Sequence, residues 1–136
     1  MKLQRVLFLA LVFVLLMATT APAYAETQPY KCVFLKQTPL DYTIMSPNQH
    51  FTMVWTLKNS GTQAWKGIYL VYLGGTHMEQ FSPVIHLMQT VAHGQLLSAK
   101  VPMIAPAAKG AYYEADWGLA VGTTVFCKFY VVISVK

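Results

Sequence analysis

The segment from Phe51 to Trp65 constrains the fold more than any other, because two tryptophans stand on either side of one turn. From Phe51 to Leu57 the residues alternate strictly between two sets, a period of two that is typical of a half-buried β-strand. Asn59-Ser-Gly61 then supplies residues that tolerate a positive φ or bond their own backbone, so the chain can reverse. The segment predicts a strand, a turn and a second strand anchored in a core. The set expected to face that core comprises Phe51, Met53, Trp55 and Leu57.

The rest of the chain is divided by turn residues every eight to twelve positions or so, which is the spacing of a sandwich or barrel. No window after residue 25 shows a sustained helical period. The apolar run Ile68–Leu73 predicts a central strand covered on both sides, and Pro83 predicts an edge strand after it. We therefore expect one all-β domain, a β-sandwich of about seven strands. The expected strands are 30–36, 51–58, 65–73, 83–88, 96–104, 111–119 and 126–135.

The first 25 residues have the pattern of a Sec-type signal peptide. Lys2 and Arg5 make a basic start, an apolar run covers 6–17, and Ala23-Tyr-Ala25 offers small residues to a signal peptidase. We expect cleavage after Ala25, with an uncleaved membrane anchor as the alternative. The sequence thus predicts a signal peptide at 1–25 and a domain at 26–136. Such a domain is secreted, periplasmic or extracellular and meets the membrane only during export.

The charge pattern argues against a nucleic-acid partner. The net charge of +5 includes Lys2 and Arg5, and the remaining lysines are scattered singly. No arginine follows Arg5, so the bidentate phosphate recognition for which arginine is suited is not expected.

Cys32 and Cys127 are the only cysteines and stand near the two ends of the expected domain. In an exported chain such a pair predicts a disulfide, which here closes a loop worth about 4 kcal/mol in the chain-entropy picture. The bridge requires the first and last strands to be neighbours. The alternative, redox or metal chemistry of two thiols, lacks a CxxC motif or a nearby ligand cluster.

A tyrosine that enters a late strand shortly before a tryptophan resembles the tyrosine corner of immunoglobulin-like sandwiches. In the segment before Trp117 this residue is Tyr113, with Tyr112 as the alternative.

The order of these residues resembles the four-tryptophan (FW) domain, an immunoglobulin-like family first described in the next-to-breast-cancer-gene autophagy receptor and also found in bacterial secreted proteins. The likeness extends over about 85 residues. Two departures stand out: Tyr130 takes the place of the fourth tryptophan, and His93 that of a proline. The resemblance implies an immunoglobulin- or fibronectin-type fold and a non-enzymatic module; family members in autophagy receptors bind proteins. The matching residues are Phe51, Trp55, Leu57, Asn59, Gly61, Thr62, Trp65, Leu70, Gly75, Gly94, Ala105, Pro106, Gly110, Tyr113 and Trp117.

The pattern and the resemblance together predict a core rich in aromatic residues. Truncating one of the large aromatic side chains to alanine is expected to cost about 3–5 kcal/mol. The expected core comprises Phe51, Trp55, Leu57, Trp65, Leu70, Tyr113, Trp117, Tyr130 and Ile133.

Catalytic motifs are lacking in the sequence. Glu114 and Asp116 share one face of a strand, where a solvated stripe explains them better than a pair of catalytic carboxylates across a cleft. No serine lies in a Gly-x-Ser-x-Gly elbow, and no glycine-rich loop could cradle a phosphate. We expect no enzyme activity and no cofactor.

A copper site is one alternative function, because imidazole and thioether ligands together suit copper(I). His86 and Met88 are two residues apart and would share a face, and the loop after Gly75 could bring His77 or Met78 close. The competing explanation is that the methionines fill the core and the histidines sit in turns.

The function expected is that of a secreted binding module for a protein or cell-envelope ligand, held on loops of a rigid sandwich. Candidate loops are 74–82 and 109–112. A carbohydrate-binding module is the second alternative, since sugars stack on exposed aromatic faces, and Trp65 is its best residue because it begins a strand. The candidate ligand surface comprises Trp65, Tyr69, Tyr72 and Tyr112.

Overall fold

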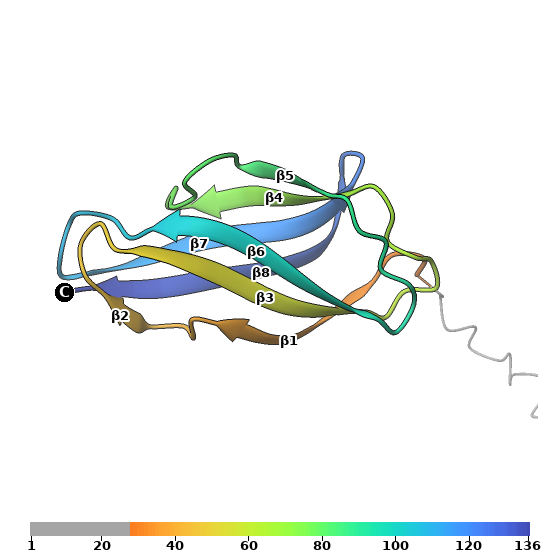
Figure 1. The fold of residues 1–136 in the computed structure, drawn as a ribbon, viewed down its shortest axis with the longest axis horizontal. Helices are drawn as coiled ribbons and strands as arrows, with labels where there is room; N and C mark the ends of the chain where they lie inside the picture. The colour runs from red at the N-terminus through yellow and green to blue at the C-terminus, as the bar shows by residue number, and fades with distance from the viewer. Residues whose placement is uncertain (1–27) are drawn as a thin grey trace, which may run out of the picture.

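The computed structural model describes residues 28–136, and the predicted signal peptide lies outside them. The described residues form eight β-strands in two stacked sheets (Figure 1), which confirms the predicted all-β sandwich. One sheet has the order β1-β3-β6 and the other β2-β8-β7-β4-β5. Within residues 28–136 no helix is long and apolar enough to cross a membrane. The strands are β1 (Cys32–Thr38), β2 (Thr43–Met45), β3 (His50–Asn59), β4 (Ile68–Gly75), β5 (Val84–Leu87), β6 (Leu96–Ile104), β7 (Ala111–Val121) and β8 (Thr124–Val135).

The strand that the sequence analysis did not anticipate is β2. It has three residues, too few to show an alternating pattern, and it pairs in parallel with the end of β8. The preceding strand in the chain, β1, pairs with β3 in the other sheet. The chain therefore changes sheets between β1 and β2. This change of sheet leaves part of the edge of β8 without a neighbouring strand.

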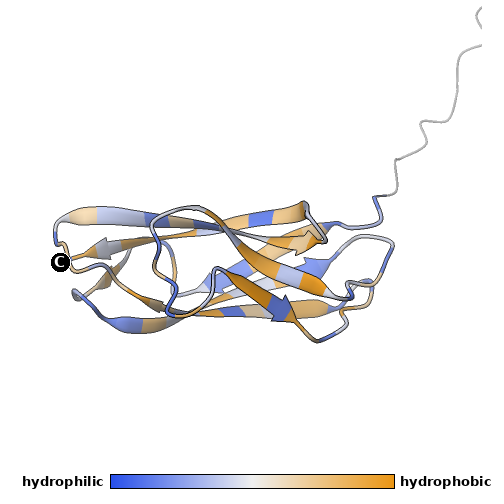
Figure 2. Ribbon diagram, turned by 90° about the horizontal axis from the view of Figure 1, so that it is seen from above, coloured by the Kyte–Doolittle hydropathy of each residue, from blue (hydrophilic) through white to orange (hydrophobic). Residues whose placement is uncertain are grey.

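The alternation predicted for β3 places its inward set in the core between the sheets. Hydrophobic and hydrophilic residues follow one another as bands along the strands (Figure 2). The ring of Trp55 lies 4.9 Å from that of Phe129 and 6.2 Å from that of Trp117. At the other end of the core, Trp65 packs against Phe126 at 5.4 Å. Phe51 and Tyr113 are partly buried at its margin. The fully buried members of the expected core are Trp55, Leu57, Trp65, Leu70, Trp117 and Ile133.

The expectation that Tyr130 belongs to the core is wrong. Its side chain is 50% exposed, whereas Phe129 beside it is buried. The register explains the difference, because Phe129 pairs with the inward Trp117 and Tyr130 with the outward Asp116. Phe129, and not Tyr130, is therefore the residue of β8 that packs against Trp55 in the core.

The prediction for β4 was wrong in one respect and that for β5 was confirmed. β4 lies between β7 and β5, but one of its faces is open: Leu73 is 39% exposed, and Tyr69 and Val71 are only partly buried. The apolar run on β4 therefore supplies both a core face and part of an outer surface. β5 is an edge strand, as Pro83 predicted.

The predicted disulfide between Cys32 and Cys127 is confirmed, with the two Cα atoms 5.7 Å apart. Its strands are not neighbours within one sheet, because β1 belongs to one sheet and β8 to the other. The bridge is a covalent connection across the sandwich. Tyr30 and Phe126 stack beside it, with ring centroids 5.4 Å apart.

Asn59 is the buried polar centre of the turn that follows β3. Its Nδ2 donates to the carbonyls of Gln63 and Val91, both at 2.9 Å, and its Oδ1 accepts from the N–H of Gly61 at 3.0 Å. These three hydrogen bonds join the turn after β3 to the segment before β6. A Cβ atom at Gly61 would lie 2.3 Å from the Pro29 carbonyl oxygen, so only glycine fits there.

The tyrosine corner is formed by Tyr113. Its hydroxyl donates to the carbonyl of Ala108, five residues upstream, at 2.9 Å. Tyr112, the alternative, points to the opposite side of β7 and is exposed.

Two buried tryptophans differ in the hydrogen bonding of their indole groups, and this difference predicts unequal costs of substitution. Trp55 Nε1 donates to the Tyr130 carbonyl at 3.1 Å, whereas Trp117 Nε1 has no partner within residues 28–136. Trp55→Phe is therefore expected to lower the free energy of unfolding by about 1–2 kcal/mol more than Trp117→Phe. Urea unfolding followed by circular dichroism measures both, and equal losses would contradict the assignment.

Candidate binding surface

Three exposed tyrosines gather on the outer face of the five-stranded sheet. Tyr42 is 64% exposed, Tyr112 69% and Tyr130 50%. The rings of Tyr42 and Tyr112 meet edge to face, with centroids 5.6 Å apart. Ile44 lies in the same row of the sheet as Tyr112, because both pair with Ser134 of β8. We call this surface the tyrosine face; it comprises Tyr42, Ile44, Tyr112 and Tyr130.

The tyrosine face has a closed floor. Val132 and Ser134 of β8 are buried beneath it, although they point outward from the sheet. Tyrosine combines a large apolar ring with a polar hydroxyl, which is why it is enriched in binding interfaces. Three such rings around a well-packed floor suit contact with another molecule.

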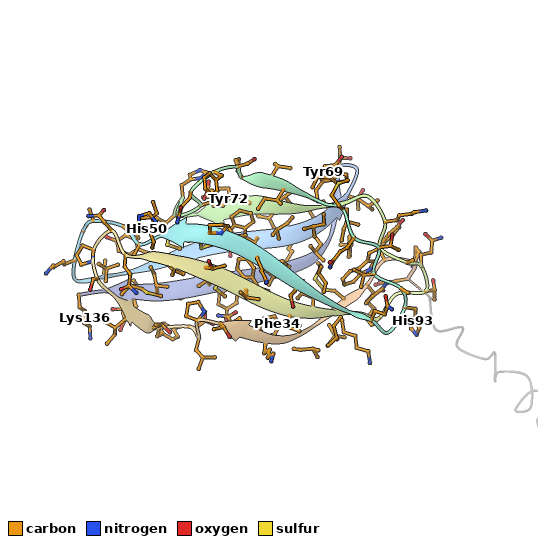
Figure 3. The ribbon with its side chains drawn as sticks, in the orientation of Figure 1. Phe34, His50, Tyr69, Tyr72, His93 and Lys136 are labelled. Carbon is orange, nitrogen blue, oxygen red and sulfur yellow. A yellow bond between two sulfur atoms is a disulfide. The ribbon has the colours of Figure 1, made fainter. Side chains whose placement is uncertain are left out.

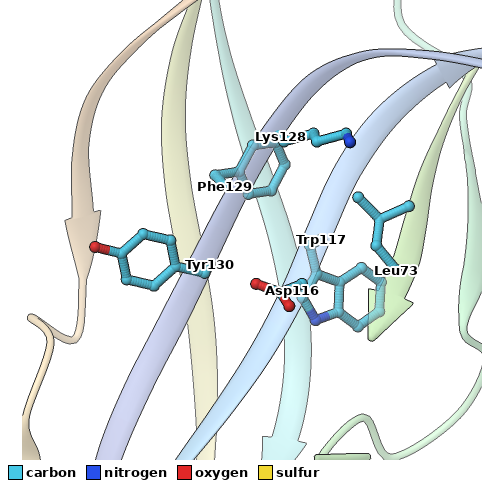
Figure 4. Close-up of a pocket in the computed structure, with 6 residues that line it drawn as sticks. All are labelled: Leu73, Asp116, Trp117, Lys128, Phe129 and Tyr130. Carbon is cyan, nitrogen blue, oxygen red and sulfur yellow. The ribbon is translucent and has the colours of Figure 1, made fainter. Parts of the chain in front are cut away.

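A hollow of about 430 Å³ borders the tyrosine face at Tyr130 (Figure 4). Next to Leu73, Gly118 of β7 is tightly enclosed: a Cβ atom there would lie 2.7 Å from the Cys127 carbonyl oxygen and 3.0 Å from the side chains of Leu73 and Val125. Asp116 and Lys128 bring opposite charges to the hollow. Neither makes an ion pair within residues 28–136. The hollow is lined by Leu73, Asp116, Trp117, Lys128, Phe129 and Tyr130.

A second hollow of about 270 Å³ lies on the other side of Tyr130, between β8 and β1. One end of it is closed by Asp41, whose Oδ1 accepts from Gln37 Nε2 at 2.6 Å and from the Val132 N–H at 3.0 Å. Tyr130 thus stands between two hollows. This second hollow is lined by Phe34, Gln37, Asp41, Lys128, Phe129 and Tyr130.

The four residues predicted as a ligand surface do not form one surface. Trp65 is completely buried, so the carbohydrate hypothesis loses its best residue. Tyr69 and Tyr72 lie toward opposite ends of β4 (Figure 3). Tyr69 points outward from β4 and stacks on His86, whereas Tyr72 points inward and packs edge-on against Trp117. Of the four, the tyrosine face includes Tyr112.

Tyr72 is instead part of a small polar cluster at the end of β4. Its ring stacks on His77 at 4.1 Å, and its hydroxyl donates to the Gly75 carbonyl at 2.7 Å. Burial, and then the carboxylates of Glu79 and Asp116, raise the pKa of the Tyr72 hydroxyl above its ordinary value. The shift further favours the neutral hydroxyl, which is the form that donates this hydrogen bond.

The residues of the copper hypothesis are not brought together. β4 and β5 are antiparallel, so the loop with His77 and Met78 lies at one end of the pair and Met88 beyond the other. Met78 is buried and Met88 is 85% exposed. His77 and His86 stack on tyrosines that point to opposite faces of the sheet. No group of three or more His, Cys, Asp or Glu suited to a metal occurs in the described part of the chain.

The two candidate loops have different surroundings. Loop 74–82 is bound to the other sheet, since the Ile104 N–H donates to the Met78 carbonyl at 2.8 Å and the Gln80 N–H to the Pro102 carbonyl at 3.0 Å. Segment 109–112 leads into the tyrosine face through Tyr112.

The two carboxylates on β7, Glu114 and Asp116, also differ in their surroundings. Glu114 is exposed, while Asp116 lines the larger hollow.

The family model described as the Ig-like domain from next to BRCA1 gene matches residues 38–135. Protein JOKA2 of Solanum tuberosum is 37% identical over 84 residues, which is 60% of this chain and 10% of that protein. Protein ILRUN of Danio rerio is 34% identical over 82 residues, 59% of this chain and 28% of that protein. The chain thus spans less than a third of either relative. The residues matched by the family model include the whole tyrosine face.

Proposed function

The chain belongs to the family of the Ig-like domain from next to BRCA1 gene, and we propose on this basis that it is a non-enzymatic module that binds a protein ligand. The tyrosine face is the surface that we assign to the ligand. The sequence favoured ligand binding by loops, whereas the tyrosine face lies on the outer side of β2, β8 and β7.

The observation that carries the proposal is the exposure of three tyrosines over a buried floor. Large aromatic residues that are left exposed contribute strongly to protein interfaces when a partner desolvates them. Leu73 extends the apolar surface along the larger hollow, and beside it Asp116 and Lys128 offer charges that form no ion pair among residues 28–136. Apolar rings with a few polar groups at the margin are the usual composition of an interface.

We also propose that the domain works outside the cytoplasm, in the periplasm or the extracellular space. The disulfide between Cys32 and Cys127 supports this location, because such bonds persist mainly in oxidising compartments. Residues 1–25 are proposed as its signal peptide, removed after Ala25. The ligand is then a protein of the cell envelope or the cell surroundings.

Site-specific crosslinking tests the proposed surface. The exported protein carries a photo-crosslinking phenylalanine analogue at position 112 or, as the matched control, at position 69 on the same face of the sheet. Crosslinking in intact cells is expected to yield one defined protein adduct from position 112, and Tyr42→Ala is expected to weaken it. Adducts that are equally abundant from both positions, or absent from position 112, would contradict the tyrosine face as the site.

A further inference from the structure

The backbone of β8 has an unfilled edge beside the smaller hollow. In a strand, the N–H and C=O of one residue point to the same side, and the side alternates along the chain. The Val132 carbonyl accepts from the Tyr42 N–H at 2.7 Å, and the Val132 N–H donates to Asp41 at 3.0 Å. Even-numbered residues of β8 near this point therefore direct their backbone groups away from β7.

This edge is filled only along part of its length. β2 pairs with Ile133 to Val135, and its ladder ends at Tyr42. Further up β8, the Tyr130 carbonyl accepts from Trp55 Nε1. The Tyr130 N–H and both backbone groups of Lys128 lie on the same edge. No strand of residues 28–136 pairs with them, because β1 belongs to the other sheet.

The space beside these groups is open. The hollow of about 270 Å³ lies between β8 and β1, flanked by Phe34, which is 47% exposed, and by Tyr130. In Figure 4 the Tyr130 ring lies on the β1 side of β8, while Trp117 and Leu73 lie on the other. The disulfide at Cys127 closes one end of this edge and Asp41 the other. The unpaired stretch of the β8 edge runs from Lys128 to Tyr130.

Parts of the other sheet edges are already paired or carry features that discourage pairing. On β6, Pro102 and Ile104 are already paired with the 78–80 segment. β1 carries Lys36 next to a bulge, and charges and bulges on an edge discourage pairing. On β5 the Ser82 hydroxyl bonds both the N–H and the carbonyl of Val84. On the open part of β8, the charge of Lys128 is the one feature that discourages pairing.

We propose that an extended segment of the protein partner adds as a strand to β8 at Lys128–Tyr130, in line with β2. The proposal rests on the proposed function and specifies how the ligand is held. The added strand would bond the free groups of Lys128 and Tyr130, and its side chains would alternate between the Tyr130 side and the Phe34 side. Apolar residues suit these two contacts, and an acidic residue suits Lys128, which has no ion-pair partner in the described residues.

A second copy of this chain is a less suitable occupant. Antiparallel pairing of two β8 edges would set the two Lys128 side chains opposite each other, or, if centred on Phe129, diagonal to each other and still within reach. Like charges opposite one another destabilise a strand pair. The excess of eight lysines over five acidic residues in 26–136 adds to this repulsion.

Amide hydrogen exchange of the exported, disulfide-bonded protein tests the free edge without any ligand. The N–H groups of Lys128 and Tyr130 are expected to exchange at least about tenfold faster than those of Phe129 and Val131, which bond β7. Alternating fast and slow exchange is the signature of an open edge. Equal protection of all four amides would overturn the proposal.

Peptide selection tests the partner. The probe is a phage-displayed library of short random linear peptides, and the selected peptides are then measured by fluorescence polarisation. We expect selected peptides to slow exchange at Lys128 and Tyr130 and to bind Lys128→Glu about tenfold more weakly, with Lys100→Glu on β6 as the matched control. N-methylation of the peptide amides that face β8 should abolish binding, and methylation of the intervening amides should not.

The outcomes separate the two proposals. Peptides that depend on Tyr112 but ignore both Lys128→Glu and N-methylation would overturn strand addition and leave the tyrosine face as the site. Failure to select any peptide would overturn recognition of an extended segment, while the crosslink from position 112 would still decide the proposed function. A dimer in sedimentation equilibrium that the neutral substitution Lys128→Gln strengthens would identify a second copy as the occupant and overturn the assignment of a partner.

Discussion

Replacing Asn59 with aspartate is expected to lower the free energy of unfolding by about 3–5 kcal/mol, because it leaves a buried group without its proper partners. The Asn59 side chain donates to the carbonyls of Gln63 and Val91. A carboxylate has the same shape but no proton to donate, so it would face two carbonyl oxygens in a site that water does not reach. No cavity forms, and the loss therefore reports the broken hydrogen bonds together with the burial of a charge.

The measurement is denaturant unfolding at neutral and at mildly acidic pH. Burial favours the neutral form of the new carboxyl group and raises its pKa in the folded state. The penalty is then fully present above that raised pKa and shrinks as the pH falls below it, because the folded state takes up the proton before the unfolded state does. The matched control is Asn48→Asp on the surface, where a change within about 0.5 kcal/mol is expected. A pH-independent loss, or one as small as that of the control, would contradict the role of Asn59.

Removal of the disulfide is expected to cost about 2–5 kcal/mol of unfolding free energy. The bond joins positions 95 residues apart and connects the two sheets directly. Without it, the unfolded chain gains freedom and the β1 side of the sandwich is held by β3 alone within its sheet.

The native protein in reductant and the Cys32→Ser/Cys127→Ser variant without reductant should have the same free energy of unfolding. Both are measured by guanidinium unfolding, and the variant itself should not respond to reductant. Retention of full stability in the variant would show that the bond contributes little. A variant that responds to reductant would reveal an artefact of the reagent rather than an effect of the disulfide.

The parts of the fold that could be predicted from sequence are those with local signals. β3 shows its core face because apolar and polar residues alternate, and Tyr113 could be recognised from its position before Trp117. The cysteines could be paired because no other partner exists in the chain. In each case a short stretch of sequence, or a simple count, contained the information.

The binding surface could not be predicted in this way, because it depends on register between distant strands. From Phe129 to Val135, β8 is apolar at nearly every position, so its sequence does not show which set faces inward. A bulge that leaves Phe126 without a partner on β7 further obscures the pattern. Tyr42 and Tyr112 are 70 positions apart and meet only because β2 and β7 flank β8. The copper hypothesis failed for a related reason, since strand direction separates residues that are close in sequence.

The hydrogen bond from Trp55 to the Tyr130 carbonyl has an optical consequence. It connects a fluorescent side chain in the centre of the molecule to the strand edge that we assign to the partner. When a peptide strand attaches beside Tyr130, the polarity and geometry around that indole change, so its emission should shift although the ring never touches the ligand. With Trp65 and Trp117 replaced by phenylalanine, Trp55 becomes a single internal reporter, and binding can be followed without labelling either molecule.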